Sequence, residues 1–150
     1  MITPATYSAV RRVQFCAGHR VHRHESKCRN LHGHNYVAYF YATAKAQQGQ
    51  ALDELGRVID FGVLKQHIGQ WLDAAWDHGF VLWDQDLEAI KAVTAVPDQK
   101  LYLLDTNPTA ENMAMHLLSV VCPKVLADTS VNIHRVKLWE TENCYVDVSI

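Results

Sequence analysis

The densest group of metal-binding side chains lies between Phe15 and Tyr36, in the stretch FCAGHRVHRHESKCRNLHGHNY. This stretch holds five of the nine histidines and two of the four cysteines. His32 and His34 flank Gly33, and the β-branched, aromatic and small residues that follow favour a strand. Because residues two apart on a strand point to one face, the two imidazoles should lie side by side. They would form half of a metal site.

A first strand is predicted over residues 7–17, with Ala17 on its apolar face. His19 continues the parity of that face. If this strand pairs antiparallel with the one that begins near His32, the intervening loop brings His19 close to His32 and His34. Three neutral imidazoles without a fourth protein ligand predict a catalytic zinc, which keeps one position open for water or substrate.

Two other kinds of metal site compete with this interpretation. A structural zinc knuckle could use C-x2-H followed by C-x3-H, formed by Cys16, His19, Cys28 and His32. It would leave His34 unused, and Cys16 and His19 would fall on opposite faces of a continuous strand. A cupin-type site also uses H-x-H, but would require a glutamate a few residues later, where this chain has none.

Two further segments could move protons. Cys28 lies between Lys27 and Arg29, and flanking cations together with a nearby metal favour its thiolate, so it is a candidate base or nucleophile. Asp77 and His78 follow the end of a predicted helix. An aspartate beside a histidine is either a surface coincidence or a relay in which the carboxylate orients the imidazole.

Length and composition indicate one domain over residues 1–150, and the order of its predicted strands and helices indicates an α+β fold. The chain is 49% hydrophobic and has a formal net charge of −2 without a basic block, which argues against nucleic-acid binding. A local cationic cluster is either a solvated loop or a contact for an anionic substrate; it consists of Arg20, Arg23, Lys27 and Arg29. No segment has the apolar length of a signal peptide or membrane span, which predicts a cytoplasmic protein with free thiols.

The remaining elements follow from apolar spacing. A helix capped by Asp60 is predicted over 61–75, and a second helix opens at Asn107-Pro108 and ends at Pro123. Strands are predicted over 131–139 and 144–150, and Glu140 at the end of the first is either a rim charge or a buried anchor. The segment from about 80 to 105 gives weaker signals: an apolar run over 80–83, a short helix over 87–93 and a strand over 101–104. It is predicted as an insert without an assigned function.

Six motifs in order along the chain resemble the family of 6-pyruvoyl-tetrahydropterin and 6-carboxytetrahydropterin synthases. They are F-x-A-x-H (15–19), C-x3-H-G-H (28–34), V-I-D-F (58–61), D-H (77–78), N-P-T-A-E-N (107–112) and W-E-T (139–141).

The resemblance implies a tunnelling fold, with a four-stranded antiparallel sheet and two helices on one face in the order ββααββ. It also implies trimers that close a β-barrel, stacked into a homohexamer with active sites at subunit interfaces. The residue roles it implies are one Zn²⁺ per subunit on His19, His32 and His34; Cys28 as general base; Asp77 with His78 as the relay; and Glu140 as the pterin anchor, helped by Thr109 and Glu111 of a neighbouring subunit.

The spacing of the cysteine selects a branch within this resemblance. Three residues separate Cys28 from H-G-H, as in the 6-carboxytetrahydropterin synthases of queuosine biosynthesis, whereas 6-pyruvoyl enzymes typically have five. The expected reaction converts 7,8-dihydroneopterin triphosphate to 6-carboxytetrahydropterin, acetaldehyde and triphosphate. The alternatives are 6-pyruvoyl-tetrahydropterin synthesis from the same substrate and, in another functional class, a non-catalytic zinc-binding module. The insert at about 80–105 departs from compact family members and could reshape the pocket mouth.

Overall fold

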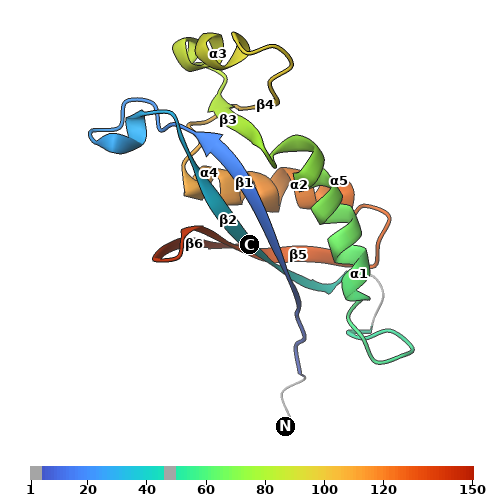
Figure 1. Cartoon of the computed structure of the whole chain (residues 1–150). Helices are drawn as coiled ribbons and strands as arrows, with labels where there is room; N and C mark the ends of the chain where they lie inside the picture. Colours follow the sequence, from blue (N-terminus) through green and yellow to red (C-terminus); the bar gives the residue numbers. More distant parts are fainter. Residues whose placement is uncertain (1–4, 46–49) are drawn as a thin grey trace.

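A curled sheet of six strands forms the frame of the protein in this computed structural model, which describes residues 5–45 and 50–150 (Figure 1). The strand order is β4-β3-β1-β2-β5-β6. The strands are β1 (Ala9–His19), β2 (His32–Ala44), β3 (Gly79–Trp83), β4 (Leu101–Leu104), β5 (Val131–Thr141) and β6 (Cys144–Ser149). Residues 1–4 of the predicted single domain lie outside the described residues, as do 46–49.

The prediction of a four-stranded antiparallel sheet was therefore correct only in part, because the sheet has two further strands. Its four strands are present as the antiparallel neighbours β1, β2, β5 and β6. Two strands of the insert extend the sheet, because β3 pairs in parallel with the end of β1 and β4 pairs in parallel with β3. A parallel pairing requires a crossover between its strands, and helix α3 (Leu87–Thr94) supplies the one from β3 to β4.

Two helical segments lie on one face of the sheet, as predicted (Figure 1). The first runs through α1 (Phe61–Leu64), the π-helical η3 (Lys65–Gly69) and α2 (Gln70–Ala75). It begins where the Asp60 side chain accepts a hydrogen bond from the Gly62 N–H. The second runs through α4 (Ala110–His116), the π-helical η4 (Leu117–Val121) and α5 (Cys122–Val125).

Both predicted ends of the second helix were wrong. Its N-cap is Thr109, whose hydroxyl accepts from the Asn112 N–H, and not Asn107. Pro123 lies inside the helix, in the first turn of α5 after the π segment. A proline is tolerated inside the segment because the π-helical η4 directly before it already interrupts the α-helical hydrogen-bond pattern.

The main hydrophobic core lies between these helices and the sheet. Phe15, Tyr36 and Phe40 from β1 and β2 pack in it with helix residues such as Leu64 and Met113. The insert has a second, small core of Leu82, Ala89 and Val93 from β3 and α3. The apolar run predicted over 80–83 forms β3, and the predicted helix and strand that follow it are confirmed as α3 and β4. Among the described residues, no helix is both long and apolar enough to span a membrane.

Candidate metal centre and proton relay

Strand pairing brings the three predicted zinc ligands together. In the antiparallel register of β1 and β2, His19 lies opposite His32 and Ala17 lies opposite His34. The alternation of the strands turns all three imidazoles toward the face that carries the core, where His19 is fully buried. The predicted pairing and the predicted shared face are both confirmed.

The ring nitrogens of these histidines are arranged as metal donors. His19 Nδ1–H donates to the carbonyl of Pro108 at 2.8 Å, and His32 Nδ1–H donates to the carbonyl of Asn30 at 2.6 Å. Because carbonyls only accept, each ring keeps its Nε2 lone pair for another partner, and the two Nε2 atoms face each other at 3.1 Å. His34 Nε2 is buried and has no hydrogen-bond partner in the described chain. Burial also lowers the pKa of His34, which favours its neutral, metal-binding form.

Glu140 joins this group, which the sequence did not predict for metal binding. Its Oε1 lies 3.2 Å from His19 Nε2 and 3.0 Å from His34 Nε2. The close approach of the His19 side chain lowers the pKa of Glu140 despite partial burial of the carboxyl. One ligand atom from each of His19, His32, His34 and Glu140 falls within 4.8 Å of the others, and this donor set fits zinc. Nitrogen donors with a carboxylate suit zinc better than calcium or magnesium, which prefer oxygen ligands alone.

Cys28 does not belong to this group of donor atoms. It lies in the 3-10 turn η1 (Lys27–Arg29) and is half-buried, and its carbonyl accepts from the Val21 N–H at 2.8 Å. Cys16 points away from His19, and its thiol donates to Asn35 Oδ1 at 2.9 Å. The zinc-knuckle interpretation was therefore wrong, because its two cysteines are not among the atoms that could hold a metal.

Asp77 and His78 form the predicted pair. His78 Nδ1–H donates to Asp77 Oδ2 at 2.7 Å, and Asp77 Oδ1 accepts from the Cys16 backbone N–H at 2.8 Å. Burial opposes ionisation of Asp77, but these hydrogen bonds and the nearby charges outweigh it and lower the pKa of the carboxyl. His78 has a positive φ of 60°, and its side chain is 79% exposed. The pair therefore presents an oriented imidazole at the surface of the chain.

Two clefts meet at the strand segment from Gly33 to Asn35. One, of about 430 Å³, is lined by His32, His34 and His78. The other, of about 550 Å³, is lined by Glu140 with Tyr39 and Trp139. Both volumes fall within the usual range for small-molecule sites.

The other candidate residues have different surroundings. Thr109 caps α4, Glu111 is exposed in the first turn of that helix, and their expected contact with a neighbouring subunit's substrate stays a prediction. Arg20 forms an ion pair with the buried Asp86 of the insert, so it is not simply a solvated loop residue. The rest of the cationic cluster is exposed, namely Arg23, Lys27 and Arg29.

Comparisons with known proteins place this site in a family. The family model described as 6-pyruvoyl tetrahydropterin synthase matches residues 8–149. A curated relative, the 6-carboxy-5,6,7,8-tetrahydropterin synthase of Rickettsia typhi, is 42% identical over 138 residues, covering 92% of this chain and 96% of the relative.

Two solved structures share the fold. A crystal structure of an uncharacterized protein from Wolinella succinogenes has a TM-score of 0.74 at 20% identity, covering 95% of this chain and 97% of the other. The 6-pyruvoyl tetrahydropterin synthase of Caenorhabditis elegans has a TM-score of 0.64 at 25% identity, covering 100% and 99%. The family match over nearly the whole sequence, together with the curated relative, shows that the chain belongs to the 6-pyruvoyl tetrahydropterin synthase family and is an enzyme, a lyase.

Proposed function

We propose that this enzyme is a zinc-dependent 6-carboxytetrahydropterin synthase. It would convert 7,8-dihydroneopterin triphosphate and one water to 6-carboxy-5,6,7,8-tetrahydropterin, acetaldehyde and triphosphate. The observation that carries the proposal is the convergence of three histidines and Glu140 in a chain that is 42% identical to a curated enzyme of that name. The three-residue spacing between Cys28 and H-G-H supports the same branch.

His19, His32 and His34 would hold the zinc through Nε2. A zinc ion bound there supplies Lewis acidity, which makes C–H and O–H protons of a nearby substrate side chain easier to remove. The carbonyls of Pro108 and Asn30 fix the orientation of two of the rings. With three protein ligands, one coordination position remains for substrate.

Glu140 would anchor the pterin in the larger cleft. The amino-pyrimidinone edge of a pterin presents two N–H donors, and one ionised carboxylate can accept both in a charge-assisted pair. The lowered pKa of Glu140 keeps that carboxylate ionised. Tyr39 and Trp139 line the same cleft and give it aromatic surface for a flat ring system.

Cys28 and His78 would move the protons. The Cys28 thiolate accepts a proton from the substrate side chain, and His78, oriented by Asp77, returns one to it. In the part of the chain that the structure describes, no hydrogen bond joins Cys28 to His78, and His78 is largely exposed. From the family resemblance we expect a homohexamer, a dimer of trimers, in which neighbouring subunits complete each site and Thr109 and Glu111 contribute.

The cellular setting belongs to the same proposal. Cys16, Cys28, Cys122 and Cys144 are free thiols, which suits a reducing cytoplasm. The product would enter the queuosine pathway.

Product identification tests the reaction directly. Zinc-loaded protein is incubated with 7,8-dihydroneopterin triphosphate, and the products are identified by mass spectrometry. Release of 6-carboxytetrahydropterin with acetaldehyde supports the proposal. A 6-pyruvoyl product would instead support the second candidate, which the description of the family itself favours. Absence of turnover by zinc-loaded protein would contradict both.

A further inference from the structure

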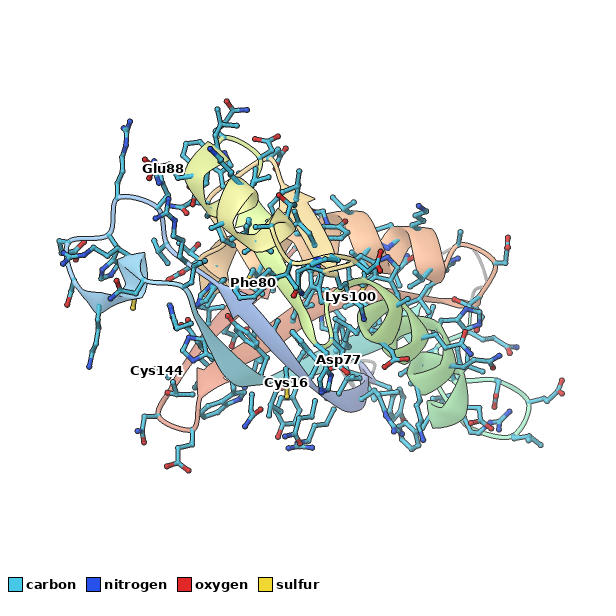
Figure 2. The ribbon with its side chains drawn as sticks, turned by 45° about the horizontal axis from the view of Figure 1, so that its top comes forward. Cys16, Asp77, Phe80, Glu88, Lys100 and Cys144 are labelled. Carbon is cyan, nitrogen blue, oxygen red and sulfur yellow. The ribbon has the colours of Figure 1, made fainter. Side chains whose placement is uncertain are left out.

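Lys100 of the insert reaches back to the turn that carries Asp77 and His78. It precedes β4, and its Nζ donates to the carbonyl of Asp77 at 2.7 Å and to the carbonyl of Asp73 at 2.8 Å. Figure 2 shows Lys100 next to Asp77, with Cys16 of β1 beyond. One ammonium group thus joins the insert to the backbone of the relay.

That turn holds an unfavourable backbone conformation. A non-glycine residue with positive φ, as at His78, costs on the order of 1 kcal/mol and persists only where surrounding contacts impose it. The His78 N–H donates to the Cys16 carbonyl at 2.7 Å, and the Gly79 N–H donates to the Trp76 carbonyl at 3.0 Å. Lys100 adds the contact on the Asp77 carbonyl. Several contacts thus hold this strained turn at a candidate functional position, which indicates that the backbone orientation of Asp77 and His78 is important for their role.

The packing around Lys100 is specific to its long stem. A Cβ at Gly79 would lie 2.8 Å from both Cγ and Cδ of Lys100, so the lack of a side chain at Gly79 makes room for the lysine. Backbone pairing fixes the other side, because the Phe80 N–H donates to the Lys100 carbonyl at 3.0 Å. The lysine is half-buried between the insert and the end of α2. Its ammonium group is therefore held in one place.

The charge of Lys100 also acts on the relay. The charged groups that face Asp77 are His78 and Lys100, and both favour its ionised form. A cation beside the last carbonyls of α2 interacts favourably with the helix dipole as well. Asp77 must stay ionised to accept the Nδ1–H of His78. The Nε2 atom of His78 is then free to face a substrate.

We propose that Lys100 is a positioning residue, through which the insert holds the Asp77–His78 pair in its working geometry. The proposal rests on the proposed function, in which His78 transfers a proton. It gives the insert a role that its sequence did not reveal.

A purely structural role for Lys100 can be separated from this one with a matched control. Lys45 makes the same kind of contact at the end of the other helical segment, where its Nζ donates to the carbonyls of Leu126 and Ala127. Lys45 contacts none of the candidate site residues. Lys45→Met and Lys100→Met each remove two ammonium hydrogen bonds from a helix end and keep an unbranched stem.

The experiment compares the two variants with the parent enzyme for thermal stability, zinc content, steady-state kinetics and the ¹⁵N resonances of His78, assigned with a His78→Gln variant. We expect both substitutions to lower Tm modestly and leave zinc content unchanged. Lys100→Met should lower kcat roughly 10- to 100-fold with little change in KM, since misplacing a proton donor costs rate more than binding. It should also shift the His78 ring from the Nδ1–H tautomer toward Nε2–H. Lys45→Met should change neither kcat nor the tautomer.

Two results would overturn the proposal: equal kcat in Lys100→Met and Lys45→Met, or a His78 tautomer unaltered by Lys100→Met. If Lys100→Met does not fold, Lys100→Gln provides a second neutral variant to which the same outcomes apply. Failure of the proposed function can be distinguished from failure of the Lys100 proposal, because the parent enzyme itself would then not turn over the pterin triphosphate. The His78 resonances would still report on positioning in that case.

Discussion

The Nε2 atoms of His19 and His32 lie 3.1 Å apart, while both Nδ1 atoms are committed to backbone carbonyls. Two neutral imidazoles in these tautomers turn lone pairs toward each other, which is repulsive unless a cation lies between them. The Nε2 atom of His34 lies at the same place, 3.0 Å from Glu140 Oε1. The geometry of these rings therefore favours a bound metal ion.

Measurements of zinc binding test this arrangement of the three histidines. Zinc should bind with one ion per subunit, and X-ray absorption should find nitrogen and oxygen but no sulfur in the first shell. At a free zinc concentration 100 times Kd, the ion should stabilise the fold by about 2.7 kcal/mol. His32→Ala should lose zinc, whereas His134→Ala, at a histidine that pairs with Ser8, should retain it. A sulfur ligand would contradict the site.

Cys28→Ala should separate metal binding from proton transfer. Because the thiol is not among the donor atoms of the cluster, zinc content should stay at the parent level. Loss of a general base typically lowers kcat by about 10²- to 10⁴-fold. Cys144→Ala, which removes an exposed thiol, is the matched control and should keep full activity. Full turnover by Cys28→Ala would rule out the assigned base.

Glu140→Gln tests whether the carboxylate serves the pterin or the metal. As the anchor, Glu140 pairs with two pterin N–H groups, so the amide should weaken pterin binding by roughly 10-fold or more while zinc affinity is unchanged. Glu142→Gln, in the same cleft, should bind pterin like the parent. Isothermal titration with a pterin and with zinc measures both affinities. If only zinc affinity fell, Glu140 would be a fourth ligand and not the anchor.

The histidine site was predictable because it depends on short-range rules. A period of two places His32 and His34 on one face, and one antiparallel pairing brings His19 opposite. Glu140 was missed as a candidate ligand because its position depends on the pairing of β5 with β2, about a hundred residues away in sequence, and on an irregularity in the pairing of β5 with β6. The parity of Glu140 with Leu138 was the available signal, and it indicated the correct face.

The insert shows the same limit on a larger scale. Its strands and helix were predictable from apolar spacing, but the parallel pairing of β3 with β1 involves only two residue pairs, Ala17 with Gly79 and Gly18 with Phe80. Local sequence does not encode a partner strand of that kind. The contact of Arg20 with Asp86 was equally hidden, because nothing in the loop indicates a carboxylate 66 residues later.

That ion pair carries the last prediction. Asp86 is 2% exposed, accepts from Arg20 and caps α3 by accepting from the Ala89 N–H. Its hydrogen bonds with Arg20 hold the pKa of Asp86 below the ordinary value of 3.8. The stability linked to this lowered pKa is present above the ordinary value and is lost as the pH falls through the pKa of the folded state.

Asp86→Asn should therefore lower the free energy of unfolding by about 3 kcal/mol at neutral pH, since it leaves the Arg20 charge without its partner. The difference from the parent should shrink at strongly acidic pH, where Asp86 of the parent is itself protonated. Denaturant unfolding at both pH values measures this. Asp84→Asn removes a carboxylate that, among the described residues, is bonded only to the side chain of Gln85, and it should cost little at either pH. A deficit in Asp86→Asn that did not change with pH would contradict the ion pair as its source, because protonation of Asp86 in the parent removes the same charge.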